Sequence, residues 1–518
     1  MELKVNRSLI LTCVCAAVSA TSLYAKKLQK PNVLIIYTDD HRYTGVHCLG
    51  GQTVRTPNID ELANNGIAFT NAYLQGGFTG ATSVPSRAML LTGRNLFQLD
   101  GMGFDIPKKD ITIGEVFGKA GYCTHHIGKW HQDLFTLARS FQNGDHIAGK
   151  PVYLCDQFRA SLSDWDATGK YDKKKCYYLH YNDQGEIVKL PSLGAKQGPF
   201  GTEKDGPHVA SVLGDDVVRF FKNYNGKKPF FVYLAFPCPH DPRQSPEKYK
   251  NMYPEENIQL TPSYMLQHPF DNGHCFLRDE ELAPWPRTPE VARKQLSDYY
   301  ASITYTDEQI GRVIRELRES GQYENTLIIF AGDSGLAVGN HGLMGKQSVY
   351  DEDGVHVPFI ISGGLVKNED KGRREPAFCY IHDIMPTICQ WVNLPIPSSV
   401  TGTSLMPVIK HETKQIHEEL YFAYRQHQRA IRKGDYKLIE YVKAPDFEKP
   451  RGEFMSGSRV TQLFNLAKDP WETQNLAFFP EYAELIASLQ KDMKAMAQKF
   501  GDKADGKRTK VNFWQYYN

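Results

Sequence analysis

The sequence of 518 residues has no excess of charge of either sign. Its 61 Lys and Arg residues stand against 59 Asp and Glu residues, which gives a formal net charge of +2. This balance excludes a nucleic-acid surface built on bulk basic charge, so we expect no nucleic-acid partner. Repeats and low-complexity tracts are also missing, and the 41% hydrophobic and 12% aromatic content excludes disordered and collagen-like proteins.

Long apolar runs are missing as well, apart from a short one near the N-terminus. The run from Leu9 to Ala20 follows Lys4 and Arg7, and small residues lead on to Ala25. It is shorter than the roughly 20 residues that a bilayer requires, and its order of charged, apolar and small residues is typical of secretion signals. We interpret residues 1–25 as a cleaved export signal, with a buried N-terminal helix as the alternative. We therefore expect an exported protein, periplasmic or secreted, without a membrane span.

No two cysteines have the CxxC spacing of a zinc ribbon or a thioredoxin-type redox site. Cys155 and Cys176 flank a Lys-rich loop, and an oxidising compartment would allow them to form a disulfide. A chain of this length does not need such a bridge, so we assign no role to any thiol.

Short apolar runs alternate with helical patterns along most of the chain. This alternation predicts an α/β fold with a mixed, mostly parallel sheet sandwiched by helices. The runs expected to form buried strands are 33–37, 122–127, 230–236, 326–330 and 357–361. The clearest helical patterns are 209–224, 291–320 and 380–392. Residues 134–206 and 241–289 are predicted to be long loops that shape the walls of a substrate site.

The pattern changes after about residue 410. The segments 419–424, 429–431, 436–442 and 462–465 predict a short antiparallel meander, and 480–500 a final helix. We therefore expect a catalytic domain over 26–410 and a smaller C-terminal α+β subdomain over 411–518.

Polar residues follow the first four predicted strands. In chain order they are Asp39 and Asp40, Lys129 and His131, His240, and Asp333. Taken singly, each has an ordinary interpretation as a helix cap, a turn residue or a satisfied histidine. Ligand sites of open α/β sheets lie outside the carboxyl ends of the strands, so the six together predict one cleft.

Three of these residues, Asp39, Asp40 and Asp333, would put three carboxylates in one pocket. Like charges at such proximity require a compensating cation. Surroundings rich in oxygen suit a hard divalent ion, and a flexible site lined by protein favours calcium over magnesium. The histidines that a two-zinc site would need are not found, because His125, His126 and His382 are isolated from this pattern.

The segment from Ser83 to Arg94 predicts a helix that begins near Ser83. Pro85 suits a first helical turn, and Gly93 suits a helix end. The free N–H groups at such a helix start stabilise an anion, and Arg87, one turn on, would add a charged hydrogen bond. The alternative is that Ser83 merely caps the helix.

The residues at this point resemble the type I sulfatases of the alkaline-phosphatase-like superfamily. The family signature places a Cys or Ser in a C/S-x-P-S-R context, which Ser83 to Arg94 matches, and that residue is converted to formylglycine. Other matching segments occur in family order and cover nearly all of the chain after the signal: 38–40, 56–60, 127–131, 239–240, 332–335, 341–346 and 469–473.

The resemblance implies a sulfuric ester hydrolase with one calcium ion. Ser83 would be the formylglycine precursor, converted by a radical-based maturase of the bacterial Ser type. Asp39, Asp40 and Asp333 match calcium ligands, and the modified Ser83 would complete the shell. The sequence departs from the family at Ser334, where many relatives carry Asn or His, and a serine hydroxyl is a weaker ligand.

The resemblance also implies roles for the polar residues around Ser83. Arg87 and Lys129 would steady the formylglycine, and His131 would remove a proton from its hydrate. Lys129, His240 and Lys346 would bind the sulfate oxygens. His240 would also protonate the leaving alcohol.

The expected substrate is a sulfated sugar bound end-on, as in glycan-degrading bacterial sulfatases. Residues with suitable side chains for sugar contacts are His41, His180, Arg243, His274, Arg278, Trp285 and Arg287, although each is more often an ordinary loop residue. Two other functions stay open. One is a phosphoester or phosphonate hydrolase of the same superfamily, and the other is a glycan-binding relative that keeps Ser83 unmodified.

Overall fold

The computed structural model describes residues 30–153, 156–192, 200–446, 454–503 and 511–517. The predicted export signal and Cys155 lie outside these residues. Within the described ranges, no helix combines the length and apolar character required to cross a membrane.

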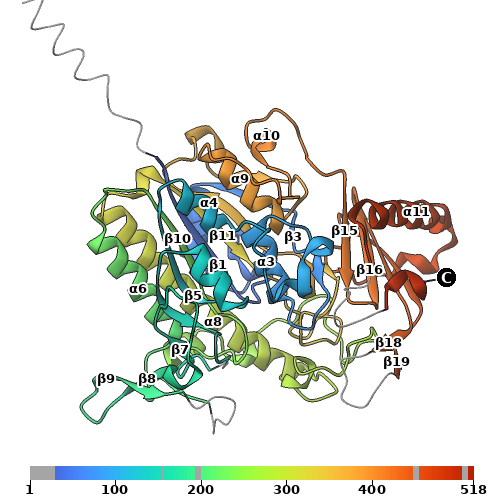
Figure 1. Cartoon of the computed structure of the whole chain (residues 1–518). Helices are drawn as coiled ribbons and strands as arrows, with labels where there is room; N and C mark the ends of the chain where they lie inside the picture. Colours follow the sequence, from blue (N-terminus) through green and yellow to red (C-terminus); the bar gives the residue numbers. More distant parts are fainter. Residues whose placement is uncertain (1–29, 154–155, 193–199, 447–453, 504–510, 518) are drawn as a thin grey trace, which may run out of the picture.

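A sheet of eleven strands forms the centre of the molecule (Figure 1). The strand β1 (Asn32–Thr38) pairs in parallel with β10 (Phe230–Ala235) and β11 (Thr326–Gly332), and β10 pairs in parallel with β5 (Cys123–Lys129). The strand β12 (Phe359–Ser362) is antiparallel to β11. One edge of the sheet is completed by β2 (Ile67–Phe69) and β13 (Arg373–Glu375). The predicted α/β class and the five buried strands are confirmed.

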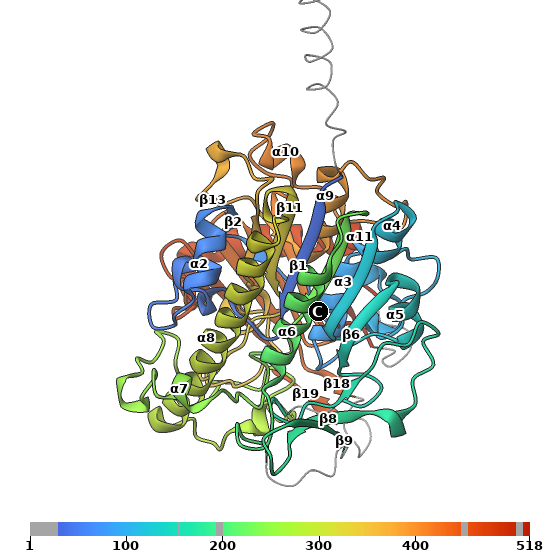
Figure 2. The same ribbon diagram turned by 90° about the vertical axis from the view of Figure 1, so that its left-hand side faces the viewer.

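Helices cover both faces of this sheet (Figure 2). Alternate residues of β1 point to opposite faces, so Val33, Ile35 and Tyr37 join one core while Leu34 and Ile36 join the other. The first core includes α3 (Ser83–Thr92), α4 (Ile113–Lys119) and α9 (Ile384–Trp391). The second includes α2 (Pro57–Asn64), α6 (Val209–Asn223) and the long helix α8 (Pro289–Glu319). Burial on both sides explains why the strands are almost continuously apolar.

A second sheet lies beside the first and carries the C-terminal part of the chain (Figure 1). It contains β15 (Glu419–Tyr424), β16 (Gln428–Lys433), β17 (Tyr436–Tyr441) and β20 (Val460–Asn465), covered by α11 (Ala483–Phe500). Its fifth strand, β4 (Gly76–Gly77), comes from the N-terminal part and pairs with β15. The predicted meander is confirmed, while the domain boundary at 410 stays a prediction.

The expectation that 134–206 is a loop is wrong for much of that segment. It forms α5 (Leu134–Ser140) and four strands that extend the central sheet: β6 (Asn143–Ala148), β7 (Leu162–Ser163), β8 (Tyr177–Tyr181) and β9 (Ile187–Pro191). These strands are short and only partly buried, so they lack the continuous apolar runs that identify buried strands. The segment 241–289 is irregular as expected, apart from α7 (Glu247–Lys250) and two short 3-10 turns.

The remaining elements are small. They are two strand pairs, β3 (Ala72–Tyr73) with β14 (Cys379–Tyr380) and β18 (Ala444–Asp446) with β19 (Phe454–Ser456), and the short helix α10 (Met406–Ile409).

Candidate active site

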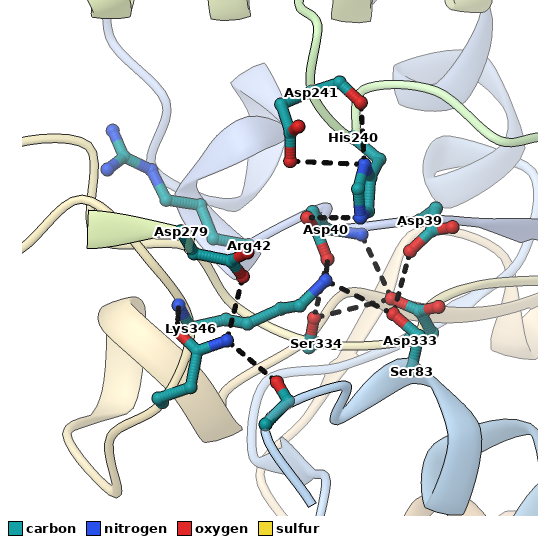
Figure 3. Close-up of polar contacts among 12 residues, drawn as sticks. Asp39, Asp40, Arg42, Ser83, His240, Asp241, Asp279, Asp333, Ser334 and Lys346 are labelled. Carbon is teal, nitrogen blue, oxygen red and sulfur yellow. Dashed lines mark hydrogen bonds and ion pairs between the residues drawn. The ribbon is translucent and has the colours of Figure 1, made fainter. Parts of the chain in front are cut away.

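The carboxyl ends of β1, β5, β10 and β11 meet at one edge of the central sheet. Asp39 and Asp40 follow β1, Lys129 ends β5, and His240 and Asp333 follow β10 and β11. Figure 3 shows most of these side chains converging on Ser83 and Lys346. The parallel pairing of these strands places their ends side by side, so residues far apart in sequence form one site.

Ser83 is the first residue of α3, and its side chain points into this site. Its Oγ donates to Asp39 Oδ1 at 2.8 Å and accepts from Lys346 Nζ at 3.3 Å. The residue is 1% exposed. The helix ends at Gly93 in the left-handed conformation with φ of 62°, so the helix predicted from Pro85 and Gly93 is confirmed.

Asp39, Asp40 and Asp333 form a buried cluster of carboxylates. The Asp40 backbone N–H donates to Asp333 Oδ1 at 2.9 Å. Asp40 has a φ of 60°, which is rare for a residue other than glycine. The Ser334 hydroxyl lies 3.1 Å from Asp40 Oδ1 and 3.3 Å from Asp333 Oδ1, so it faces the same centre.

Three cationic side chains form ion pairs with the three carboxylates. Arg87 Nη2 lies 3.0 Å from Asp333 Oδ2 and 3.5 Å from Asp39 Oδ2. Lys129 pairs with Asp39, and Lys346 pairs with Asp40. Because all three cations are buried, their charges are little screened by solvent.

The pKa values of the carboxyls reflect this balance. Burial would raise the pKa of Asp39, but the charges of Lys129, His240 and Arg87 outweigh it and hold that pKa well below its usual range. Burial and the charge of Asp39 raise the pKa of Asp333 to about 7, although Arg87 opposes the shift. The cationic side chains therefore compensate Asp333 less than Asp39.

The donor set of this cluster fits a calcium ion. Five oxygen-bearing side chains face one centre: Asp39, Asp40, Asp333, Ser83 and Ser334. Carboxylate and hydroxyl oxygens are the donors that a hard divalent cation prefers. A cation at this centre would also stabilise the ionised form of Asp333. Asp39, Asp40 and His240 also bring their ligand atoms within 4.8 Å of one another.

His240 and His131 both pack against the ring of Tyr153. His240 Nδ1 donates to the Asp241 backbone carbonyl at 2.7 Å, so Nε2 faces Asp40 Oδ2 at 3.8 Å and the Tyr153 hydroxyl at 3.4 Å. The His131 ring stacks on Tyr153 with a centroid separation of 5.3 Å. Burial and the nearby Lys129 hold the pKa of His131 well below its usual range, so its imidazole is neutral. His240 and Tyr153 border a pocket that is also lined by Lys129, Gln157 and Asp241.

Three residues that sequence reasoning missed belong to this site. The Tyr153 hydroxyl accepts from Lys129 Nζ at 3.3 Å. The Asp241 carboxylate lies 3.2 Å from His240 Nδ1, and its position directly after His240 was a usable signal. Asp279, which accepts from Gln347 Nε2 at 2.7 Å and interacts electrostatically with Lys346, comes from an irregular segment that offered no signal.

The candidates named for sugar contact differ in how exposed they are. His41 is 1% exposed and bonds to Thr38 and the Gly45 carbonyl, and Arg287 is 0% exposed and pairs with Glu280. Both side chains are held inside the protein by these contacts.

The other members of that set are placed differently. Arg278 has a side chain that is 54% exposed and pairs with Asp241 beside His240, and Trp285 is 39% exposed. His180 is partly exposed, Arg243 bonds to Gln295, and His274 is buried.

A family model described as sulfatase matches residues 31–394. The chain belongs to the sulfatase family. It is accordingly a sulfuric ester hydrolase of the alkaline-phosphatase-like superfamily. A second model, described as N-sulphoglucosamine sulphohydrolase, C-terminal, matches residues 339–499, which include the second sheet.

The alignments with similar proteins cover almost the whole length of this sulfatase. An arylsulfatase of Clostridium perfringens is 29% identical and covers 89% of this chain and 93% of its own. An N-acetylglucosamine-6-O-sulfatase of Bacteroides thetaiotaomicron is 24% identical, over 99% of this chain and 94% of its own. A solved structure of a protein with its substrate D-glucosamine-2-N,6-O-disulfate superposes with a TM-score of 0.69 at 20% identity, covering 92% of this chain and 100% of that one.

Proposed function

We propose that this protein is an exported sulfatase that removes sulfate from a sulfated sugar, using formylglycine at position 83 and one calcium ion. The observation that carries the proposal is the position of Ser83. Its Oγ lies at the start of α3, between Asp39 Oδ1 and Lys346 Nζ and beside the carboxylate cluster. A nucleophile at this point would be close to both the cation and the groups that bind sulfate.

The calcium ion would be held by Asp39, Asp40 and Asp333, with residue 83 and Ser334 as further oxygen donors. When bound, it acts as a Lewis acid that makes a nearby hydroxyl more acidic and stabilises negative charge on the sulfuryl group. Lys129 and Lys346, each paired with a carboxylate of the cluster, are positioned to bind sulfate oxygens.

Formylglycine at position 83 would supply two hydroxyl groups when hydrated, one for attack on sulfur and one for release of sulfate, whereas an unmodified serine would retain a stable sulfate ester. Arg87 and Lys129 would hold this side chain through their contacts with Asp39. His131 is neutral and has a buried Nδ1 without a hydrogen-bond partner among the described residues, so it is suited to accept the proton of the second hydroxyl.

His240 is suited to give a proton to the leaving alcohol. Its Nδ1 is fixed by the Asp241 backbone carbonyl, and its Nε2 faces the cleft. The nearby carboxylates of Asp40 and Asp241 would stabilise the protonated ring. Protonation matters because a sugar alkoxide is a poor leaving group.

The sugar substrate is supported by the names of the relatives, which include a sulfatase of N-acetylglucosamine and a protein whose substrate is a sulfated glucosamine. We propose exo-action on fragments of host mucin, glycosaminoglycan or algal polysaccharide. The proposal also includes export by the signal over 1–25 and conversion of Ser83 by a formylglycine-generating maturase.

The decisive experiment is mass spectrometry of the Ser83 peptide, combined with sulfate release from a panel of sulfated monosaccharides. Protein produced with the maturase is expected to carry formylglycine and to release sulfate. Active protein with an unmodified Ser83 would rule out the mechanism. Faster turnover of phosphate or phosphonate monoesters would favour the related hydrolases, and binding of glycans without turnover would favour the glycan-binding alternative.

The substitution Ser83→Ala is expected to abolish sulfate release below detection while the melting temperature changes little. Its Oγ makes two hydrogen bonds, and each is worth about 1 kcal/mol. Ser302→Ala is the matched control, because Ser302 is also a buried serine but lies on α8. Turnover by Ser83→Ala, or equal losses in both variants, would contradict the assignment.

A further inference from the structure

A second cluster of ligating side chains lies outside the site described above. It consists of His274 from the 241–289 segment, His427 from the turn between β15 and β16, and Asp446 at the end of β18. These residues are 6%, 0% and 0% exposed. The cluster therefore joins a predicted substrate wall to the C-terminal sheet in the protein interior.

The donor atoms of this cluster are close enough to share one ion. One ligand atom from each of the three residues lies within 4.8 Å of the others. His274 Nε2 is 3.8 Å from Asp446 Oδ2, and the two imidazole rings have centroids 5.9 Å apart. Zinc binds imidazole nitrogen and carboxylate oxygen at about 2.0–2.2 Å, so a small contraction would bring these donors to one ion.

His427 gives an independent sign of a missing ligand. Neither of its ring nitrogens has a hydrogen-bond partner in the part of the chain that the structure describes, although the residue is fully buried. Buried polar side chains nearly always have a partner, and an unsatisfied one costs free energy. A bound ion would satisfy one of these nitrogens directly.

The surroundings orient the cluster. The Tyr424 hydroxyl hydrogen-bonds to His274 Nδ1 at 2.6 Å, which leaves Nε2 directed at Asp446. Such an outer hydrogen bond on the other ring nitrogen is the usual arrangement of metal-bound histidines. Gly273 has a φ of 98°, and a Cβ at this position would lie 2.3 Å from His427 Cγ, so the backbone packs directly against the ring.

We propose that His274, His427 and Asp446 bind a divalent transition metal of the zinc class, at a site separate from the calcium cluster. Two imidazoles with one carboxylate suit zinc rather than calcium, which prefers oxygen donors. Three protein ligands leave a fourth position for water. The ion would tie the 241–289 segment to the C-terminal sheet.

The full-length protein is dialysed in calcium-saturated buffer, and its zinc content per chain is then measured by elemental mass spectrometry. We expect about one zinc per chain, and a rise in melting temperature when zinc is added. His427→Ala and Asp446→Asn are expected to lose this zinc. His411→Ala, an exposed histidine of the C-terminal region, is the matched control and should keep it.

The variant Asp39→Asn tests whether the measured zinc is bound at the calcium cluster instead. We expect this variant to bind as much zinc as the parent protein. Anomalous diffraction at the zinc edge from crystals of the parent protein locates the ion even if the histidine variants do not fold. Zinc lost in Asp39→Asn but kept in His427→Ala, or no anomalous peak between His274 and His427, would overturn the proposal. Neither readout depends on sulfatase activity.

Discussion

At the scale of single residues, each buried carboxylate of the site depends on a neighbouring cation for its stability. Asp39 is flanked by Arg87 and Lys129, and Asp40 by Lys346. An isolated buried carboxylate would cost several kcal/mol, and a buried ion pair requires further hydrogen bonds to be favourable. Substitution of one partner therefore acts on the others, and single variants inside the cluster test several roles at once.

His240 lies at the edge of this cluster, so its role can be tested more cleanly. His240→Ala is expected to lower turnover of a sulfated sugar by about 10²–10⁴-fold, the usual contribution of a general acid. An aryl sulfate with an acidic phenol should lose much less, because that leaving group needs no proton. Parallel kcat measurements on both substrates check this. Equal losses would show that His240 binds sulfate without donating the proton.

Asp307 on α8 supports a pH prediction away from the site. Its carboxylate accepts from the Asn58 and Ile59 backbone N–H groups at the start of α2. Burial raises its pKa to about 7, although these hydrogen bonds oppose the shift. A carboxyl whose folded pKa exceeds its unfolded value binds its proton more tightly when folded. Its contribution to stability is therefore present at low pH and is lost as the pH rises toward 7.

We expect the melting temperature of the parent protein to fall more between pH 5 and pH 8 than that of Asp307→Asn, which cannot titrate. The difference corresponds to a few kcal/mol at most, since each pKa unit is worth about 1.4 kcal/mol. Asp298→Asn, a more exposed carboxyl of the same helix, is the control and should follow the parent. Identical pH profiles for Asp307→Asn and the parent would refute the assignment.

At the scale of elements, the sequence was informative where geometry follows from regular structure. Parallel strands end at a common edge, so Asp39, His240 and Asp333 could be placed together from strand patterns alone. Pro85 and Gly93 likewise marked the helix that carries Ser83. Tyr153 could not be found this way, because it comes from a segment whose fold depends on long-range contacts rather than on a local period.

A buried lysine contributes to the contact between the two sheets. Lys437 on β17 is 0% exposed, and its Nζ lies 2.6 Å from Asp351 Oδ1 and 2.9 Å from Glu472 Oε1. Asp351 begins the π-helical turn Asp351–Val355, in the segment between β11 and β12 of the central sheet. The lysine therefore joins the C-terminal sheet to the catalytic part of the chain.

Lys437→Met is expected to destabilise the protein by about 3–5 kcal/mol, because it leaves the buried carboxylate of Glu472 without its cation and Asp351 with only Arg432, 3.5 Å away. Lys433→Met on the neighbouring strand is the matched control. Its side chain is 47% exposed and pairs with Asp492, and exposed pairs contribute about 1 kcal/mol or less. Thermal unfolding of both variants checks the difference. Similar melting temperatures would show that the buried network is dispensable.

At the scale of the whole molecule, calcium would couple activity to stability. An ion that binds only the folded protein at 100 times its Kd adds about 2.7 kcal/mol to the free energy of unfolding. Chelation is therefore expected to lower activity and melting temperature together, with recovery when calcium is restored. Asp333→Asn should show no such response. Activity and melting temperature that are unchanged by chelator would count against the three-carboxylate site.

The pairing of β4 with β15 has a consequence for the order in which the protein matures. Gly76 and Gly77 can pair with their partner strand only after residues 419–424 have been synthesised. Because translation adds about 5–20 residues per second, the pairing is delayed by tens of seconds. Throughout this interval the segment leading to Ser83 lacks its final neighbour. The proposed conversion of Ser83, whose side chain ends up 1% exposed, would therefore be favoured before this pairing forms. Late synthesis of the C-terminal sheet would lengthen the period in which the proposed maturase could reach Ser83.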